Sequence, residues 1–241
     1  MLVGLASAVV RWLLMAPRCL LYYITDRSQF RGDEAARRRA LLAKIAEAAQ
    51  AGVDYIQLRE KDLTARELEG LAREAVRVLH EAGQAVTSDQ RLTTSLLINS
   101  RTDISLAVGA AGVHLPSNDI SPAEVRQIWT LCGAGALARR QPVITVACHT
   151  TEDVLRAESE NADFALFAPV FEKVRTAAAG LAALGEACQV RIPVLALGGV
   201  TLENAISCLE AGAAGVAAIR LFQENRIEDV VRTLRNNHAA K

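Results

Sequence analysis

Short apolar segments alternate with longer amphipathic segments along most of the chain, and this alternation restricts the possible folds more than any other feature. From residue 20 onward, eight apolar or β-branched runs are each long enough for one buried strand. Runs that are apolar on both faces are typical of parallel strands covered on both sides. The runs are Leu20–Thr25, Val53–Arg59, Ser95–Asn99, Gly112–Leu115, Pro142–Cys148, Asp163–Phe167, Ile192–Leu197 and Gly215–Arg220.

The segments between these runs carry helical patterns with recognisable ends. Thr64 with Glu67 forms a capping box at the start of one predicted helix, and the Ser-Pro-Ala-Glu sequence from residue 121 forms another. Gly52 is expected to end the first helix as its C-cap. The predicted helices are Glu34–Ala51, Thr64–Ala82, Asp103–Val108, Ser121–Leu131, Thr150–Glu160, Ala177–Gln189, Thr201–Ala211 and Ile227–Asn236.

Eight successive strand–helix units predict a parallel sheet with right-handed crossovers. About 220 residues for eight units fit a closed (β/α)₈ TIM barrel, and an open, doubly wound sheet is the alternative. No Pro-rich or Ser/Gly-rich linker divides the chain, so residues 20–241 are expected to form one barrel domain. Residues 1–19 are expected to be poorly ordered or an over-extended start, because their apolar run is too short to span a bilayer and lacks a basic signal-peptide region.

Charge and composition argue against several kinds of partner. Lys plus Arg and Asp plus Glu number 27 each, which gives a net charge of zero, and aromatic residues make up only 4% of the chain. We therefore expect neither a nucleic acid nor a membrane as partner, because these need an excess of basic or stacking residues. The five cysteines are widely spaced without a CxxC pair, which favours reduced thiols and a cytoplasmic location.

The second apolar run ends in QLREK at residues 57–61, which places two basic side chains at a predicted strand end. Side chains of a strand alternate between its faces, so the first, third and fifth residues of this stretch share one side. In a (β/α)₈ barrel the chemistry lies at the carboxyl ends of the strands. Arg59 and Lys61 there predict a phosphate or diphosphate site. The alternative is an internal salt-bridge layer with Asp26 or Asp119.

A second anion site is predicted where the seventh and eighth runs end. Gly198 and Gly199 have no side chains, so backbone amides there can approach an anion closely. The loops after strands seven and eight commonly bind phosphate in such barrels. Arg220, at the end of the eighth run, either adds positive charge to this site or points outward.

Three other side chains near the strand ends are candidates for metal binding or catalysis. Asp119 fits as a ligand of Mg²⁺ or, equally, as a cap for the helix that follows it. His149 is a candidate general acid or base, or a structural residue. Cys148 faces the opposite way along the strand, so a Cys–His nucleophile pair is not expected. His114 is expected to be a hydrogen-bonded residue inside the barrel.

In their order along the chain, the strand ends resemble those of the thiamine phosphate synthase and thiazole tautomerase superfamily. The segments that carry the resemblance are YYITDR, AGVDYIQLREKD, INSRTDISLAVGAAGVHLPSNDIS, HTTEDVLRAESENADFALFAPVF, IPVLALGGVT and AGAAGVAAI. The resemblance implies a (β/α)₈ barrel and a transferase of thiamine biosynthesis. Such a synthase joins an aminopyrimidine diphosphate to a thiazole phosphate and releases diphosphate with Mg²⁺. The implied partners are therefore phosphorylated pyrimidine and thiazole molecules, and a homo-oligomer stays open.

The resemblance also assigns roles to individual residues. The family's Gln-Leu-Arg-x-Lys stretch matches residues 57–61, which would hold the pyrimidine diphosphate and stabilise the departing charge. The thiazole phosphate would lie against the glycine pair and the backbone amides after the eighth run. The implied substrate-binding residues are Gln57, Leu58, Arg59, Glu60, Lys61, Asn99, Gly198, Gly199, Ile219 and Arg220. The implied catalytic residues are Arg59, Lys61 and His149, and the implied metal ligand is Asp119.

Several positions depart from the synthase pattern. Ser100 stands where the family has a metal-binding aspartate, and a serine hydroxyl is a poor ligand for a hard cation. Ala147 and Arg220 each stand where the family has a serine. The family's Pro-Thr-x-Thr-Lys loop after the sixth run is absent, so Lys173 or Arg175 would have to replace its lysine.

These departures leave two further functions open. A metal-independent thiazole tautomerase would isomerise a thiazole carboxylate phosphate with a histidine at the fifth strand end, which His149 matches, and it would need no Mg²⁺. A non-enzymatic barrel that binds a phosphorylated ligand is the third hypothesis. Arg59 and Lys61 favour the synthase, whereas Ser100 and Ala147 favour the tautomerase.

Overall fold

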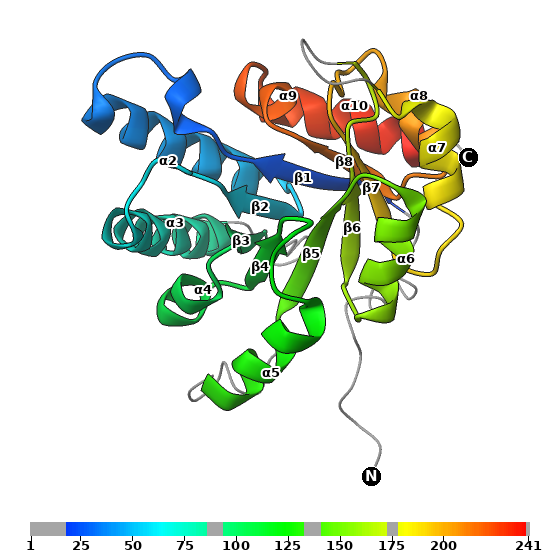
Figure 1. The fold of residues 1–241 in the computed structure, drawn as a ribbon. Coiled ribbons are helices and arrows are strands. Elements are labelled where there is room, and N and C mark those ends of the chain that lie inside the picture. The colour runs from blue at the N-terminus through cyan, green and yellow to red at the C-terminus, as the bar shows by residue number, and fades with distance from the viewer. Residues whose placement is uncertain (1–17, 86–93, 133–140, 173–177, 240–241) are drawn as a thin grey trace.

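The eight apolar runs pair side by side into a closed barrel of parallel strands (Figure 1). This computed structural model describes residues 18–85, 94–132, 141–172 and 178–239. The strands are β1 (Leu20–Ile24), β2 (Tyr55–Leu58), β3 (Ser95–Asn99), β4 (Gly112–Leu115), β5 (Val143–Cys148), β6 (Phe164–Phe167), β7 (Val194–Leu197) and β8 (Gly215–Ala218). The prediction of a (β/α)₈ barrel is thus confirmed, and the open doubly wound sheet is excluded because β1 pairs with β8 as well as with β2.

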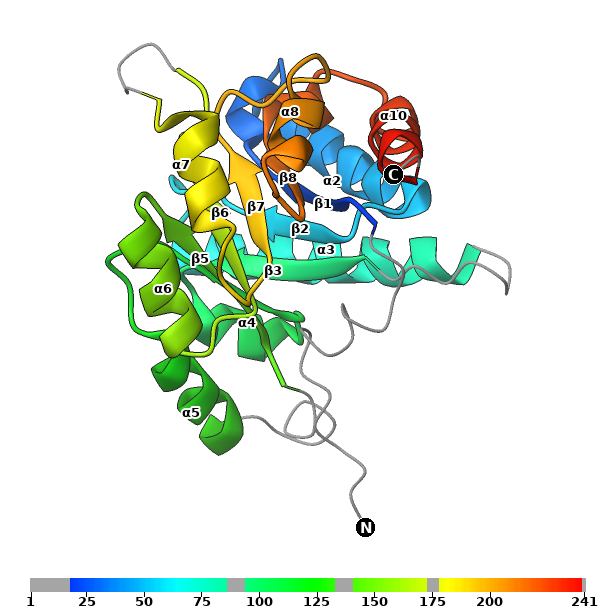
Figure 2. The same cartoon turned by 90° about the vertical axis from the view of Figure 1, so that its right-hand side faces the viewer.

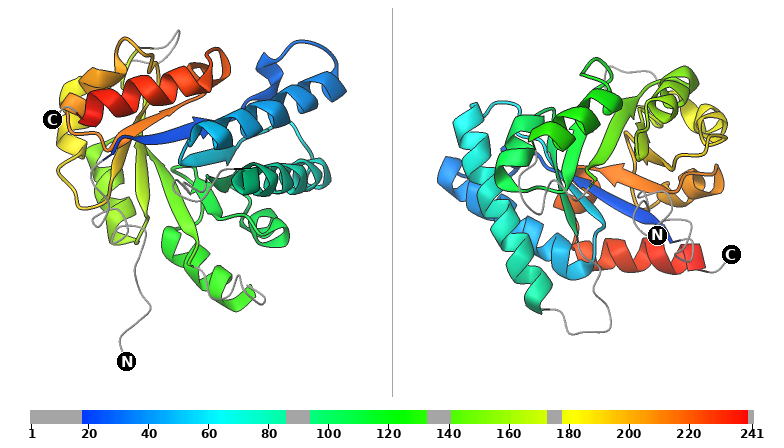
Figure 3. Two further views of the ribbon diagram at one scale, coloured as in Figure 1. Left: turned by 180° about the vertical axis from the view of Figure 1, so that it is seen from behind. Right: turned by 90° about the horizontal axis from the view of Figure 1, so that it is seen from below.

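Helices follow the strands and cover the outside of the barrel. They are α2 (Glu34–Ala51), α3 (Ala65–Ala85), α4 (Thr102–Val108), α5 (Pro122–Cys132), α6 (Thr151–Ser159), α7 (Gly180–Ala187), α8 (Ala205–Glu210) and α10 (Ile227–Ala239), with the short helices η1 (Arg27–Gln29) and α9 (Arg220–Gln223). Figure 2 shows α6, α7 and α8 along the outside of the later strands. Figures 1 and 3 show α10 beside α2, so the helical ring closes where the sheet closes.

The helix ends agree with the predicted caps, although some boundaries differ. Thr64 and Glu67 form the expected capping box, since the Thr64 hydroxyl accepts the Glu67 N–H and the Glu67 carboxylate accepts the Thr64 N–H. Gly52 ends α2 with φ of 83°, a left-handed conformation in which glycine is favoured. The helix predicted from residue 201 begins only at Ala205, because residues 202–204 form a turn. None of the helices in the described ranges is long and apolar enough to cross a membrane.

Strand alternation divides the core into two layers. Tyr22, Leu97 and Phe164 lie in the cluster that fills the inside of the barrel. Tyr23 and Phe167 each come directly after an inward-facing residue, so their side chains face outward. They lie in the larger cluster between the strands and the helices. The direction of each side chain at a strand end is therefore fixed by its position in this alternation.

At the amino ends of the strands, two buried aspartates join neighbouring strands. The Asp54 carboxylate accepts the Leu21 N–H at 2.9 Å and forms ion pairs with Arg18 and Arg235. Residues 1–17 of the expected N-terminal segment lie outside the described residues, and Arg18 already contacts the barrel through this pair.

The second aspartate repeats this arrangement on the opposite part of the barrel. The Asp163 carboxylate accepts the Ile144 N–H at 2.8 Å and pairs with Arg126 at 3.0 Å. Its side chain is only 5% exposed, so its charge depends on these partners for stabilisation.

We predict that Asp163→Ala lowers the free energy of unfolding by about 2–4 kcal/mol, because it leaves the buried Ile144 N–H and the Arg126 guanidinium without their partner. The measurement is urea-induced unfolding at neutral pH. The control is Asp103→Ala, which removes an ion pair with Arg101 from a side chain that is 65% exposed; its expected effect is below about 1 kcal/mol. Equal losses in the two variants would contradict the prediction.

Candidate active site

Polar side chains from β2, β3 and β4 line the inside of the barrel near its carboxyl-terminal mouth. Asn99 lies opposite His114 in the register, and Gln57 comes from the strand on the other side of Asn99. The Gln57 Nε2 donates to the Asn99 Oδ1 at 2.8 Å. The Gln57 Oε1 is buried and has no hydrogen-bond partner among the described residues. A buried amide oxygen in this state is an acceptor suited to an N–H group of a ligand.

His114 is held inside the barrel by a short hydrogen-bonded chain. Its Nδ1 lies 2.9 Å from the Thr145 Oγ1, which lies 3.0 Å from the Tyr22 hydroxyl. Burial, together with the positive charge of Arg59, lowers the pKa of His114 to about 3. His114 is therefore neutral near pH 7, and its predicted role as a hydrogen-bonded residue inside the barrel is confirmed.

Arg59 and Lys61, the two predicted anion-binding cations, follow β2 on this side of the barrel. Arg59 is partly buried and close enough to act electrostatically on His114, whereas Lys61 is exposed in the turn that follows. Within the described ranges neither side chain forms an ion pair. The alternative salt-bridge layer is not formed there: Asp26 accepts hydrogen bonds from its own η1 turn, and Asp119 accepts the next backbone N–H.

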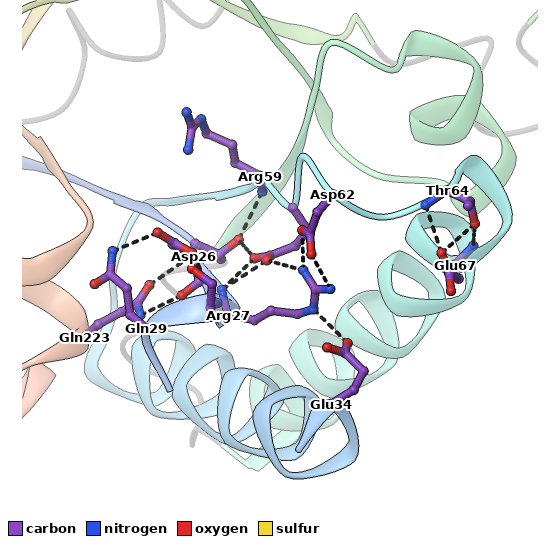
Figure 4. Close-up of polar contacts among 12 residues, drawn as sticks. Asp26, Arg27, Gln29, Glu34, Arg59, Asp62, Thr64, Glu67 and Gln223 are labelled. Carbon is purple, nitrogen blue, oxygen red and sulfur yellow. Dashed lines mark hydrogen bonds and ion pairs between the residues drawn. The ribbon is translucent and has the colours of Figure 1, made fainter. Parts of the chain in front are cut away.

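Arg27, which the sequence did not single out, is the centre of a cluster of charged residues beside the mouth (Figure 4). Its guanidinium donates to the Asp62 carboxylate at 2.7 and 2.9 Å, to Glu34 at 2.7 Å and to Glu60 at 3.2 Å. The hydrogen bonds and charge of Arg27 lower the pKa of Asp62, and Asp62 in turn raises the pKa of Arg27. Burial raises the pKa of Glu60, and hydrogen bonds from Thr25 and Arg27 oppose this shift.

The structure gives Leu58 and Glu60, two of the expected substrate-binding residues, other partners. The Leu58 side chain is fully buried in the outer core between the strands and the helices. The Glu60 carboxylate is occupied by Thr25 and Arg27. The side chains of both residues therefore face away from the mouth, as strand alternation opposite Gln57 and Arg59 requires.

The glycine pair after β7 has a packing role in the structure. Gly198 and Gly199 have φ of 96° and 69°, which disfavours other residues. A Cβ on Gly198 would lie 2.7 Å from the Pro169 Cα, and one on Gly199 would lie 2.8 Å from the Phe171 Cβ. Asn204 also holds this loop, since its side chain accepts the Thr201 N–H and donates to the Gly199 carbonyl. The pair thus shapes a bare backbone loop, whereas phosphate binding there stays a prediction.

The expected end of the eighth run lies partly in a helix. β8 ends at Ala218, and Arg220 begins the short helix α9 rather than extending the strand. Arg220 is exposed, and Ile219 is half-buried at the junction between the two elements. The helix starts here because the chain turns at Ile219, which has φ of −96° and ψ of −72°.

His149 follows β5 and is exposed, with its ring held on one side. Its Nδ1 lies 2.7 Å from the Ala168 carbonyl oxygen, and a carbonyl can only accept, so Nδ1 carries the proton. The Nε2 of a neutral ring is then the basic nitrogen. Cys148 is fully buried, and burial raises the pKa of its thiol to about 12. The expectation that these two residues do not form a nucleophile pair is therefore confirmed.

The described residues do not build a metal site from protein ligands. They contain no group of three His, Cys, Asp or Glu side chains placed to hold an ion. Asp119 is exposed, and the α5 cap is supplied by Ser121 and Glu124. Ser100, at the position of the family's aspartate, has φ of 59° and accepts a hydrogen bond from Asn99. Lys173 and Arg175, the candidate replacement cations, lie outside the described residues.

Comparison with known proteins identifies the family. The model of the thiamine monophosphate synthase family matches residues 21–222. The chain belongs to this family. The thiamine-phosphate synthases of Syntrophomonas wolfei and Clostridium novyi are 35% and 33% identical to it, over 89% and 90% of this chain and 94% and 97% of theirs. A solved thiamine phosphate pyrophosphorylase from Pyrococcus furiosus is 25% identical with a TM-score of 0.72, and the match covers 93% of this chain and 97% of that one.

We predict that His114→Gln removes part of the acid sensitivity of this family member. The unfolded histidine binds a proton below about pH 6.5, whereas the folded one stays neutral down to about pH 3. The free energy of unfolding of the wild type therefore falls as pH falls through this range, by up to about 1.4 kcal/mol per pH unit from this group. Urea unfolding between pH 4 and pH 7 should show a shallower dependence for the variant.

His80→Gln is the matched control, because His80 is exposed on α3. It should retain the pH dependence of the wild type. A His114→Gln protein with the same pH dependence as the wild type would show that His114 does not titrate as its burial implies.

Proposed function

We propose that the chain is a thiamine-phosphate synthase that joins an aminopyrimidine diphosphate to a thiazole phosphate at the carboxyl-terminal mouth of the barrel. The observation that carries this proposal is the pairing of an unoccupied acceptor with an uncompensated cation. The buried Gln57 Oε1 has no partner among the described residues. The Arg59 guanidinium, which follows on the same face of the strand and acts electrostatically on His114, has no ion-pair partner there. The amino group of an aminopyrimidine diphosphate would donate an N–H to the Gln57 Oε1, and its diphosphate would supply negative charge to Arg59.

The reaction needs charge stabilisation more than proton transfer. The bond between the pyrimidine methylene carbon and the diphosphate oxygen breaks, and its electron pair leaves with the diphosphate. Arg59 and Lys61 stabilise this departing charge. The thiazole nitrogen then donates its lone pair to the methylene carbon and forms the new C–N bond. Gly198, Gly199 and the backbone amides of residues 219 and 220 are the proposed site of the thiazole phosphate.

We propose that Mg²⁺ arrives at the site bound to the diphosphate of the substrate. Mg²⁺ sites with one or two carboxylates rely on substrate phosphates and water for their other ligands. Asp119 is the carboxylate that the chain offers, and the Ser100 hydroxyl does not replace a second one. A cytoplasmic location also belongs to the proposal, supported by the five free cysteines.

A thiazole tautomerase is the second candidate, and the orientation of His149 is what favours it. With Nδ1 held by the Ala168 carbonyl, Nε2 is available to move a proton on a ligand at the mouth. This chemistry needs neither Arg59 nor a metal ion, which makes the two candidates separable by experiment.

We predict that Arg59→Ala lowers kcat/KM for thiamine phosphate formation by about 10²-fold or more, because one preorganised cation is lost from the departing diphosphate. Product is measured by chromatography with both substrates and Mg²⁺. Arg77→Ala, on the exposed face of α3, is the control and should keep wild-type activity. Wild-type activity in Arg59→Ala, or chelator-resistant thiazole isomerisation that His149→Ala abolishes, would overturn the synthase in favour of the second candidate.

We further predict that Ser100→Asp lowers the Mg²⁺ concentration needed for half-maximal synthesis by about tenfold, because it restores a hard anionic ligand. The left-handed backbone at this position tolerates Asp better than most residues. Ser100→Ala should leave the Mg²⁺ dependence unchanged. An equal Mg²⁺ requirement in wild type and Ser100→Asp would show that this position lies too far from the diphosphate to bind its ion.

A further inference from the structure

The backbone of Arg59 is tied to the neighbouring strand by a buried hydroxyl. The Arg59 N–H donates to the Thr25 Oγ1 at 3.0 Å, and the Thr25 hydroxyl donates to the Glu60 Oε1 at 2.6 Å. Thr25 is completely buried and Glu60 is 5% exposed. The carboxyl ends of β1 and β2 are therefore joined just where the second strand presents its arginine.

We propose that Thr25 and Glu60 are positioning residues that direct the Arg59 guanidinium into the mouth of the barrel to receive the diphosphate. The inference rests on the proposed function, in which Arg59 binds that group. It assigns to Glu60 a role through Arg59 in place of the direct substrate contact expected from the family resemblance.

The Thr25 hydroxyl has a fixed direction. A hydroxyl has one hydrogen, and Glu60 takes it, so an oxygen lone pair is left to accept the Arg59 N–H. A valine of the same shape would remove the acceptor of this partly buried N–H. The hydroxyl therefore restrains the peptide from which the arginine side chain extends.

Glu60 is itself immobilised by Arg27. The Glu60 carboxylate accepts the Arg27 backbone N–H at 3.0 Å and its Nη1 at 3.2 Å. Arg27 is held from the other side by Glu34 at the start of α2 and by Asp62 in the turn after β2. Glu60 thus has a fixed position from which to hold the Thr25 hydroxyl.

The loop after β1 is also fixed at its other edge. The Gln223 side chain accepts the Asp26 N–H at 2.9 Å and donates to the Asp26 carbonyl at 3.0 Å. This pair of bonds joins α9 to the loop next to Thr25. Hydrogen bonds therefore restrain the loop from both of its neighbours in the barrel.

The Arg59 side chain depends on this backbone restraint because no ion pair fixes its direction in the part of the chain that the structure describes. Figure 4 shows it extending away from the carboxylates around Arg27. A long side chain without an ion-pair partner loses rotamer entropy when it binds a ligand, and a fixed backbone direction reduces that loss.

The test measures binding of inorganic diphosphate in the presence of Mg²⁺ by isothermal titration calorimetry, so it does not depend on turnover. We expect Thr25→Val to weaken diphosphate binding by about tenfold. Thr25→Ser keeps the hydroxyl and should bind within about twofold of wild type. Glu60→Gln should weaken binding in the same direction as Thr25→Val, because the amide is a weaker acceptor and loses the charge that holds Arg27.

A double-mutant cycle with Arg59→Ala separates positioning from a general structural effect. If Thr25 acts through Arg59, then Thr25→Val adds nothing to the loss of affinity in the Arg59→Ala protein. A structural role would weaken binding to the same extent in both backgrounds. Asp163→Ala, which is destabilised at the opposite end of the barrel, should bind diphosphate as the wild type does.

The outcomes distinguish this inference from the proposed function. If Arg59→Ala abolishes binding while Thr25→Val binds as the wild type does, or if the two losses are additive, the inference is wrong and the proposed function stands. If the wild type does not bind diphosphate, or binds it equally well without Arg59, both are wrong.

Discussion

The closure of β8 onto β1 is the constraint on which the rest of the structure depends. Once Leu20–Tyr23 pair with residues 215–218, every strand has two neighbours and every side chain faces either the barrel interior or the helices. The same alternation extends past the end of β2, where it separates Gln57 and Arg59 from Leu58 and Glu60. The hydrogen bonding of the sheet therefore determines which side chains point into the mouth of the barrel.

Much of this arrangement was predictable from local patterns. Eight apolar runs identified the strands, and the capping residues Thr64 and Gly52 identified helix ends, because both signals depend on neighbouring residues only. The hydrogen-bonded position of His114 inside the barrel was also predictable, from its place in a buried run. The metal ligand Asp119 and the phosphate loop at the glycine pair were expected both from their residue types and from the family resemblance, and both stay predictions.

The cluster around Arg27 was not predictable in the same way. Its partners Glu34, Glu60 and Asp62 come from three separate elements, and only the packed loops after β1 and β2 bring them within hydrogen-bond distance. The glycine pair was ambiguous for a related reason. Its bare backbone was interpreted as an anion site, whereas the close approach of Pro169 and Phe171 already requires glycine there.

Buried charges are paired at both ends of the barrel, whereas the partly buried Arg59 at the mouth has no ion-pair partner among the described residues. At the amino ends of the strands, Asp54 and Asp163 are paired with arginines and with backbone N–H groups, so their burial supports the joining of strands. At the mouth, Arg59 has no such partner among the described residues, although the paired Arg27 lies close by. A cation without an ion-pair partner is available to an anionic ligand, and the binding of that ligand stabilises the folded state. The loop that holds Arg27 also restrains the Arg59 backbone, because Thr25 accepts the Arg59 N–H and Glu60 joins Thr25 to Arg27.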